Sequence, residues 1–104
     1  MQDSFLVVLD YPQSGERIRG RDNVQASRAG HPAHRRFEVH RIFGSGDLWV
    51  TELVIVYDDR SYCTVSVMEL MDGEVMHETQ YFSDPFDAPA WRAQWVEKVP
   101  SARR

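Results

Sequence analysis

The chain has 104 residues, which is long enough for one domain with a single hydrophobic core. Its formal net charge of −4 argues against a nucleic-acid surface, and the single Cys63 excludes an internal disulfide and gives no metal-ligand spacing. No apolar run reaches the roughly 18 residues of a membrane span, and Phe5–Leu9 is too short for the core of a signal peptide. We therefore expect a cytoplasmic protein that binds no nucleic acid, enters no membrane and carries no metal or other cofactor.

The first third of the chain is predicted to form two short strands and a helix. Residues Ser4–Asp10 are typical of a strand, which ends at the turn Tyr11–Gly15. Glu16–Arg19 fits a second short strand. Gly20 then opens a predicted helix over Arg21–Ala29.

A run of four strands follows, and its turns predict how the strands pair. Each segment alternates or is rich in β-branched and aromatic residues, and hairpin turns separate the segments. The predicted strands are Phe37–Phe43, Leu48–Tyr57, Tyr62–Met71 and Val75–Phe82. We take Ser45-Gly46, Asp59-Arg60 and Asp72-Gly73 as the central residues of the three turns. In the resulting register, one row across the sheet is Val39, Glu52, Val67 and Glu78, each facing the next. A second row is Arg41, Val50 and Glu69.

This register gives the predicted sheet two different faces, because side chains alternate along a strand. One face is mostly apolar but carries four charged residues, namely Arg41, Glu52, Glu69 and Glu78. The other face is rich in Thr, Tyr and His. Charges within an apolar surface are costly to bury without a partner or a purpose, so this cluster is the first candidate for a site. A single bulge would exchange the two faces beyond it.

The C-terminal part is predicted to contain a second helix. An irregular connection over residues 83–89 leads to a helix over Ala90–Lys98, with Pro89 suited to its start. Trp91 and Trp95 are four residues apart and would share one helix face. Two interpretations remain open: both tryptophans anchor the helix to the sheet, or they form a stacking platform for a ligand.

Three stretches of this sequence resemble the SnoaL-like branch of the NTF2-like superfamily. They are Leu9–Ala26, LDYPQSGERIRGRDNVQA; Gly46–Phe82, with its three-strand meander and Asp-Gly turn; and Ser83–Trp95, SDPFDAPAWRAQW. The resemblance implies an α+β cone, in which a strongly curved, mixed and mostly antiparallel sheet has short helices on its concave side. The resemblance covers about nine-tenths of the chain, and we expect residues 1–104 to form a single domain of this type. This domain would be short at its N-terminus, because family members usually begin with long helices.

The resemblance also implies a pocket for a small apolar molecule on the concave side. By analogy with the last strand of ketosteroid isomerases, Met76, Glu78, Gln80 and Phe82 would point into the cone. The register then places Arg41, Glu52, Glu69 and Val67 inside as well, and Trp91 is a further candidate to contact a ligand. The Thr/Tyr/His-rich face would be outside, where we expect a homodimer or higher homo-oligomer to form. An exposed apolar concave face also needs a cover, from a helix or from a neighbouring chain.

Candidate catalytic residues follow from the same resemblance. Asp10 lies within one position of the carboxylate that serves as proton-shuttling base in the isomerases, and an apolar pocket would raise its pKa. Alternatively, the Asp10 side chain begins the Pro12 turn. The cluster allows two accounts: Arg41 pairs with Glu52 or Glu69 in a structural ionic network, or one glutamate acts as acid or base beside Arg41.

Two functions therefore remain open, and the sequence does not decide whether the protein is an enzyme. The first is a cofactor-independent acid–base enzyme of the cyclase, isomerase or hydrolase type, acting on an apolar substrate with a carbonyl group. Asp10, Glu52 or Glu78 would move the proton and Arg41 would stabilise developing negative charge. The second is a non-catalytic ligand-binding or dimerisation module.

Overall fold

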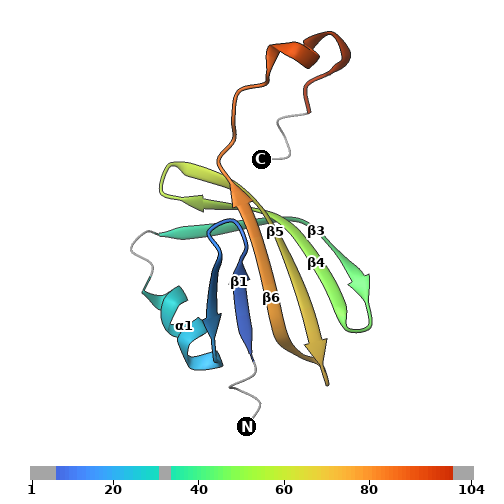
Figure 1. The fold of residues 1–104 in the computed structure, drawn as a ribbon. Helices are drawn as coiled ribbons and strands as arrows, with labels where there is room; N and C mark the ends of the chain where they lie inside the picture. Colours follow the sequence, from blue (N-terminus) through green and yellow to red (C-terminus); the bar gives the residue numbers. More distant parts are fainter. Residues whose placement is uncertain (1–6, 31–33, 100–104) are drawn as a thin grey trace.

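The computed structural model describes residues 7–30 and 34–99, and within them six strands form one mixed sheet. The strand order is β2-β1-β6-β5-β4-β3; β1 runs parallel to β6, and the other neighbouring strands are antiparallel. The elements are β1 (Val8–Tyr11), β2 (Glu16–Arg19), α1 (Arg21–Ala29), β3 (Arg35–Ser45), β4 (Leu48–Tyr57), β5 (Arg60–Met71), β6 (Glu74–Ser83) and the 3-10 helix η2 (Ala90–Trp95). The predicted α+β fold with a mostly antiparallel mixed sheet is confirmed (Figure 1).

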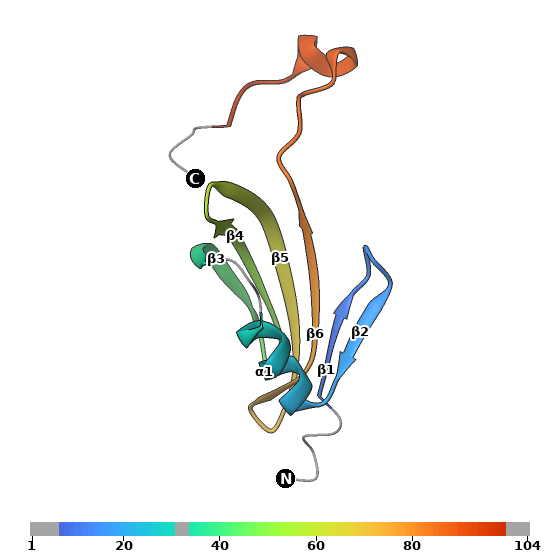
Figure 2. The same ribbon diagram turned by 90° about the vertical axis from the view of Figure 1, so that its left-hand side faces the viewer.

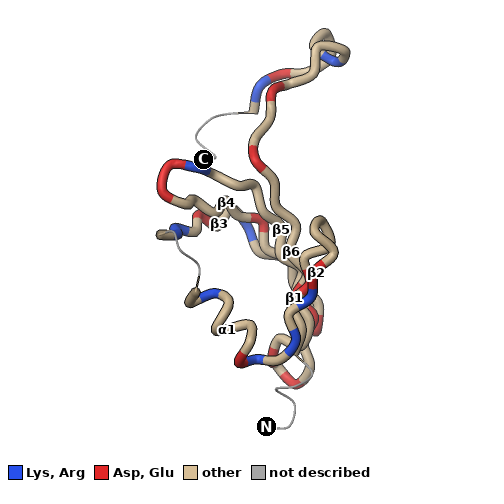
Figure 3. The backbone as a smooth tube through the Cα atoms, turned by 60° about the vertical axis from the view of Figure 1, so that its left-hand side comes forward, with Lys and Arg blue, Asp and Glu red and all other residues tan. Residues whose placement is uncertain are grey.

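The sheet curves around α1 without closing, so that α1 lies on its concave side (Figures 2 and 3). Gly20 makes the turn from β2 into α1 possible, because its φ of 95° lies in a region that favours glycine. The Gly20 N–H donates to the Val7 carbonyl at 2.7 Å, and the Val24 N–H donates to the Gly20 carbonyl at 3.0 Å. These bonds hold the start of the helix against the beginning of β1.

The core lies between α1 and the first strand. Val24 of α1 packs with Val7 and Leu9, and Leu9 is 1% exposed. Ile18 and Met76 surround this cluster from β2 and β6. Burial of these apolar side chains therefore fixes α1 on the concave side of the sheet.

Two of the three predicted turn centres are wrong. The β3–β4 turn centres on Gly46-Asp47, because Ser45 pairs with Leu48, and the β4–β5 turn centres on Asp58-Asp59, because Tyr57 pairs with Arg60. Gly46 and Asp58 have φ values of 58° and 54°, so each takes the left-handed conformation at the first central position. The third turn is confirmed at Asp72-Gly73, with φ values of 53° and 80°.

A bulge in β6 changes the predicted faces more than the turns do. Glu69 pairs with His77 whereas Leu70 pairs with Val75, so Met76 is an extra residue in β6. A bulge of this kind reverses the alternation of side chains beyond it. Glu78 consequently faces Met68, and not Val67 as predicted.

The predicted cluster of four charges is therefore divided between the two faces. Arg41 pairs with Glu52, and Glu52 pairs with Val65 of β5. Val65, Val67 and Glu69 lie on one face of β5, so Arg41 and Glu52 share a face with Glu69. Glu78 lies on the opposite face, where Arg28 of α1 reaches it. The prediction that Arg41, Glu52, Glu69 and Val67 point into the cone is wrong, because α1 covers the other face.

The inward direction predicted for β6 is confirmed. Glu78, Gln80 and Phe82 line a cleft on the concave side, and Met76 packs beside the core. For β4 and β5 the two faces are exchanged relative to the prediction. The inner face holds Thr51, Leu53, Ile55 and Tyr57 of β4, with their partners from Ser66 to Arg60 on β5.

The C-terminal segment differs most from its prediction. The expected α-helix over Ala90–Lys98 is the shorter 3-10 helix η2, which ends before Val96 takes an extended conformation. Trp91 and Trp95 are 70% and 71% exposed, so they do not anchor a helix to the sheet. The segment continues beyond the end of β6 and away from the sheet (Figures 1 and 2). No helix among the described residues is long and apolar enough to span a membrane.

Replacing Leu9 tests the core. Leu9→Ala removes a fully buried side chain and should lower the free energy of unfolding by about 2–5 kcal/mol. The measurement is chemical denaturation followed by circular dichroism. Val96→Ala, at an exposed position, is the control and should change the free energy of unfolding by less than about 0.5 kcal/mol. Equal small effects of both changes would show that Leu9 is not at the centre of the core.

Candidate functional site

The concave side of the sheet contains a cleft of about 650 Å³. A cleft of this size is within the range of sites that hold small organic molecules. Five strands or helices besides β6 contribute to it, and its walls are mostly apolar and aromatic. The lining residues are Tyr11, Ile18, Ser27, Arg28, Arg35, Phe37, Ile55, Tyr57, Glu78, Gln80 and Phe82.

Glu78 places a carboxylate in the wall of this cleft. Its side chain is 15% exposed, and Arg28 Nη2 lies 2.9 Å from its Oε1 atom. The Ser66 hydroxyl and the Gln80 amide donate to its Oε2 atom, at 2.7 and 3.0 Å. These donors, from α1 and from two strands, fix the orientation of the carboxylate. Arg28 and Glu78 also line a second cavity of about 370 Å³, which reaches the core beside Leu9.

An aromatic wall stands next to this carboxylate. The rings of Tyr11 and Phe82 stack with centroids 5.9 Å apart, and Tyr62 contacts Phe82 and Tyr57. Burial raises the pKa of the Tyr11 phenol above its ordinary value, with smaller opposing effects that include the nearby charge of Arg28. Tyr11 therefore keeps its proton at neutral pH and can serve the cleft as a hydrogen-bond donor.

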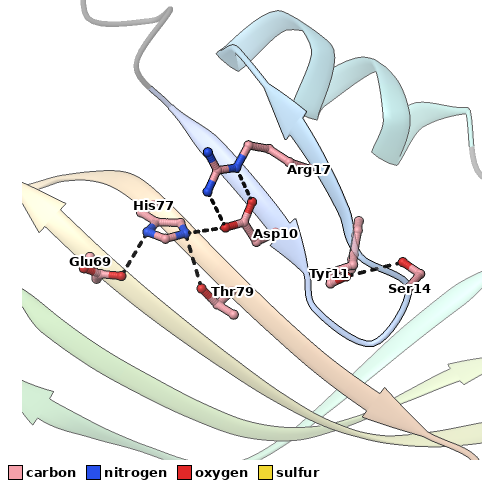
Figure 4. Close-up of polar contacts among 7 residues, drawn as sticks. All are labelled: Asp10, Tyr11, Ser14, Arg17, Glu69, His77 and Thr79. Atoms are coloured by element: carbon pink, nitrogen blue, oxygen red, sulfur yellow. Dashed lines mark hydrogen bonds and ion pairs between the residues drawn. The ribbon is translucent and has the colours of Figure 1, made fainter.

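Asp10 lies on the outer face, away from the cleft, in an ionic network (Figure 4). Arg17 binds both carboxylate oxygens, with Nε at 2.6 Å and Nη2 at 2.9 Å. His77 Nε2 lies 2.9 Å from Asp10 Oδ2, and His77 Nδ1 lies 3.0 Å from Glu69 Oε2. This network connects β1, β2, β5 and β6. The alternative prediction, that the Asp10 side chain begins the Pro12 turn, also differs from the structure, because this side chain contacts Arg17 and His77.

The environment of Asp10 is opposite to the one expected for a catalytic base. The hydrogen bond from Arg17 is the largest influence and holds the pKa of Asp10 well below its usual range. Burial opposes this shift, while the hydrogen bond from His77 and the charges of both partners support it. A carboxyl with a lowered pKa is a weak proton acceptor at neutral pH.

Arg41 and Glu52 form the ion pair that the sequence allowed. Arg41 Nε and Nη2 lie 2.9 and 3.1 Å from the two oxygens of Glu52, and the Arg41 guanidinium lies over the Phe43 ring at 4.7 Å. This pair is on the outer face, and Glu69 pairs instead with His77. The structure thus brings Glu78, Gln80 and Phe82 together in the cleft and places the other predicted site residues elsewhere.

Several cleft residues were not identified from the sequence. Arg28 could have been found from the helix period, because it lies four residues after the buried Val24 and so on the same face of α1. Tyr11 could have been found from strand alternation, since Leu9 points into the core. The described residues contain no group of three or more His, Cys, Asp or Glu side chains that could hold a metal ion.

The lowered pKa of Asp10 predicts how acid affects stability. Its charged form favours the folded state, so its contribution is complete above the ordinary aspartate pKa of about 4 and is lost as the pH falls from there toward the lowered value. Asp10→Asn should lower Tm by roughly 5 °C at neutral pH, with a smaller difference in acid. The measurement is thermal unfolding across pH, with the exposed turn residue Asp59→Asn as control. A pH-independent effect of Asp10→Asn would contradict the ionic role.

Comparison with known proteins identifies the family. No protein-family model matches the sequence, and no curated protein matches it. Among solved structures, an NTF-2-like protein of unknown function from Burkholderia xenovorans LB400 is 56% identical, with 92% of this chain and 76% of that chain covered and a TM-score of 0.81. A protein described as a "putative ketosteroid isomerase" from Kribbella flavida DSM 17836 is 26% identical, with 93% and 72% covered and a TM-score of 0.85. An LEH-like epoxide hydrolase from M. tuberculosis shares the fold, at 22% identity, 76% and 63% coverage and a TM-score of 0.59. This chain belongs to the NTF2-like proteins.

Proposed function

We propose that the concave cleft binds a small, mostly apolar molecule that carries a carbonyl oxygen, and that Glu78 transfers a proton to or from it. The observation that carries this proposal is a partly buried carboxylate, 15% exposed, in the wall of a mostly apolar cleft of about 650 Å³. Such a cleft removes apolar surface of a ligand from water, and the few polar groups in it orient the ligand.

The chemistry would divide between Glu78 and Tyr11. A carboxylate beside a carbonyl compound can accept a proton from the carbon next to the carbonyl group. The neutral Tyr11 phenol can donate a hydrogen bond to the carbonyl oxygen, where negative charge develops. Arg28 now occupies one oxygen of Glu78 and is itself half-exposed, so its displacement by a ligand would free that oxygen. This mechanism needs no cofactor.

The structural neighbours support acid–base chemistry in a coarse way. They include one protein described as a "putative ketosteroid isomerase" and one described as an epoxide hydrolase, although the relative with 56% identity is described as being of unknown function. Asp10, Arg41, Glu52, Glu69 and Val67 receive no ligand contact in this proposal, because they face away from the cleft.

A non-catalytic ligand-binding module is the second candidate. The observation that favours it is the complete set of partners around Glu78, since Arg28, Ser66 and Gln80 together engage both of its oxygens. A carboxylate held in this way can be structural and still make the cleft selective. Binding and turnover therefore need separate tests.

A matched pair of phenylalanines tests binding in the cleft. Phe37 lines the cleft and Phe43 lies on the outer face, and they are 54% and 45% exposed. Phe37→Ser should weaken the binding of the fluorescent apolar probe anilinonaphthalene sulfonate by about tenfold, because it removes an aromatic contact. Phe43→Ser should leave the affinity unchanged. A stronger effect of Phe43→Ser would place the binding surface on the outer face.

Replacing Glu78 tests proton transfer. With an apolar 3-oxosteroid whose double bond can move into conjugation, Glu78→Gln should reduce turnover by at least about a hundredfold. Ultraviolet absorbance of the conjugated product measures this rate, and binding of the fluorescent probe measures whether the cleft persists. Glu52→Gln, on the outer face, is the control. Wild-type turnover in Glu78→Gln, or no turnover in the unmodified protein, would contradict this catalytic role and leave the binding module.

A further inference from the structure

The segment after β6 exposes an unusual amount of apolar surface. We define residues 84–99 as the C-terminal arm. Large apolar side chains are exposed along its whole length, namely Phe86, Trp91, Trp95, Val96 and Val99. Exposed apolar clusters on soluble proteins commonly mark surfaces that bind a partner. Tryptophan in particular is enriched among the residues that dominate binding energy at interfaces.

The described residues of the single chain leave the large apolar side chains of this arm exposed. The radius of gyration is 16.2 Å, whereas a compact chain of this length has about 13 Å. The arm leaves β6 at Ser83 and continues away from the sheet and from α1 (Figures 1 and 2). In this conformation its tryptophans are positioned to reach another molecule.

The concave cleft has the complementary surface. Its rim carries Phe37, which is exposed, together with Tyr57 and Phe82, which are partly exposed. Arg35 adds positive charge at the same site, where Arg28 is already paired with Glu78. The first half of the arm carries two acidic residues before any basic one: Asp84, which forms an ion pair with Arg60 of its own chain at 3.2 Å, and Asp87. Aromatic side chains therefore occur on both surfaces, and Arg35 of the cleft and Asp87 of the arm carry opposite charges (Figure 3 shows the charges along the chain).

We propose that the C-terminal arm of one copy packs across the cleft of a second copy and that the exchange is reciprocal. Trp91 and Trp95 cover the rim formed by Phe37, Tyr57 and Phe82, while Glu78 remains inside. A two-fold dimer of this kind uses both arms and both clefts, so neither arm nor cleft stays uncovered. The closed site then contains residues from two chains. In closing the ligand cleft this inference rests on the proposed function, but the docking itself requires no ligand.

Disulfide trapping tests where the arm lies. Ser27 lines the cleft, Gln94 is exposed on the arm, and the native Cys63 is exposed on the outer face of the sheet. In a Cys63→Ser background, Ser27→Cys combined with Gln94→Cys should give covalent dimers under mild oxidation. Mass spectrometry of the digested product should show a bond between positions 27 and 94 of different chains. Gln94→Cys alone, with Cys63 retained, is the control for docking on the outer face.

The other trapping results would overturn the proposal. A bond between positions 27 and 94 within one chain means that the arm closes over its own cleft. A bond from the arm to Cys63 means that it docks on the outer face. A bond between two arms, or no arm bond at all, means that the cleft is not its docking site. Each result is read without a ligand, so failed ligand binding or turnover leaves this inference standing and affects only the proposed function.

Self-association gives an independent measurement. The unmodified protein should sediment as a dimer, and Trp91→Ala with Trp95→Ala should weaken dimerisation by at least about tenfold. Phe43→Ser on the outer face is the control and should leave the dimer intact. Circular dichroism checks that each variant is folded. A monomeric unmodified protein, or a dimer that persists without the tryptophans and dissociates in Phe43→Ser, would contradict arm exchange.

Discussion

The extra residue in β6 determines which chemistry faces which side of the sheet. Because Met76 has no partner of its own in β5, His77 pairs with Glu69, and Glu78 turns toward α1. The parallel pairing of β1 with β6 then follows the same alternation, since Leu9 lies beside Glu78 and Asp10 beside Thr79. The core residue Leu9 and the cleft residue Tyr11 therefore share a face with Glu78, whereas Asp10 is outside.

Two polar networks result, one on each side of β6, and they differ in what surrounds them. On the outer face, the side chains of Asp10, Arg17, His77 and Glu69 connect four strands through short polar contacts, which stabilise the sheet around β1. On the inner face, Glu78 connects α1 to the sheet through Arg28 and borders the cleft. The same kinds of residue thus support the fold on one side and form the candidate site on the other.

The general architecture could be predicted from the sequence because its signals are local. Strand composition, hairpin turns and the spacing over Arg21–Ala29 indicated the strands and the helix, while the resemblance to the NTF2-like superfamily implied the mixed, curved sheet, and the structure has both. The shifted turns at Gly46 and Asp58 displaced the predicted β4–β5 register, and the β3–β4 register from Arg41 to Ser45, by two residues, so the residues grouped on one face there stay together. A bulge between Val39 and Arg41 reduces the displacement to one residue in the first half of β3, which moves Phe37 to the inner face. The bulge at Met76 has no local signal, because Met76 by itself fits a regular strand, and the bulge arises from the pairing of its neighbours, His77 with Glu69 and Val75 with Leu70. The resemblance to ketosteroid isomerases nevertheless gave the correct direction for β6.

The C-terminal arm shows the same limit on prediction. Trp91 and Trp95 have the spacing of a helix face, but short helices depend on tertiary packing for most of their stability. Within the part of the chain that the structure describes, both tryptophans are exposed, and the segment forms one short 3-10 helix. The helix period alone could not show that these side chains lie away from the sheet.

The most direct test of this assignment of faces is the pairing of β5 with β6, measured by nuclear Overhauser contacts in isotopically labelled protein. Backbone contacts between Met68 and Glu78, and between Glu69 and His77, are predicted by the bulge at Met76. Side-chain contacts between Glu78 and Arg28 should accompany them. A regular hairpin, in which Val67 faces Glu78 and Glu69 faces Met76, would contradict the assignment and remove Glu78 from the cleft.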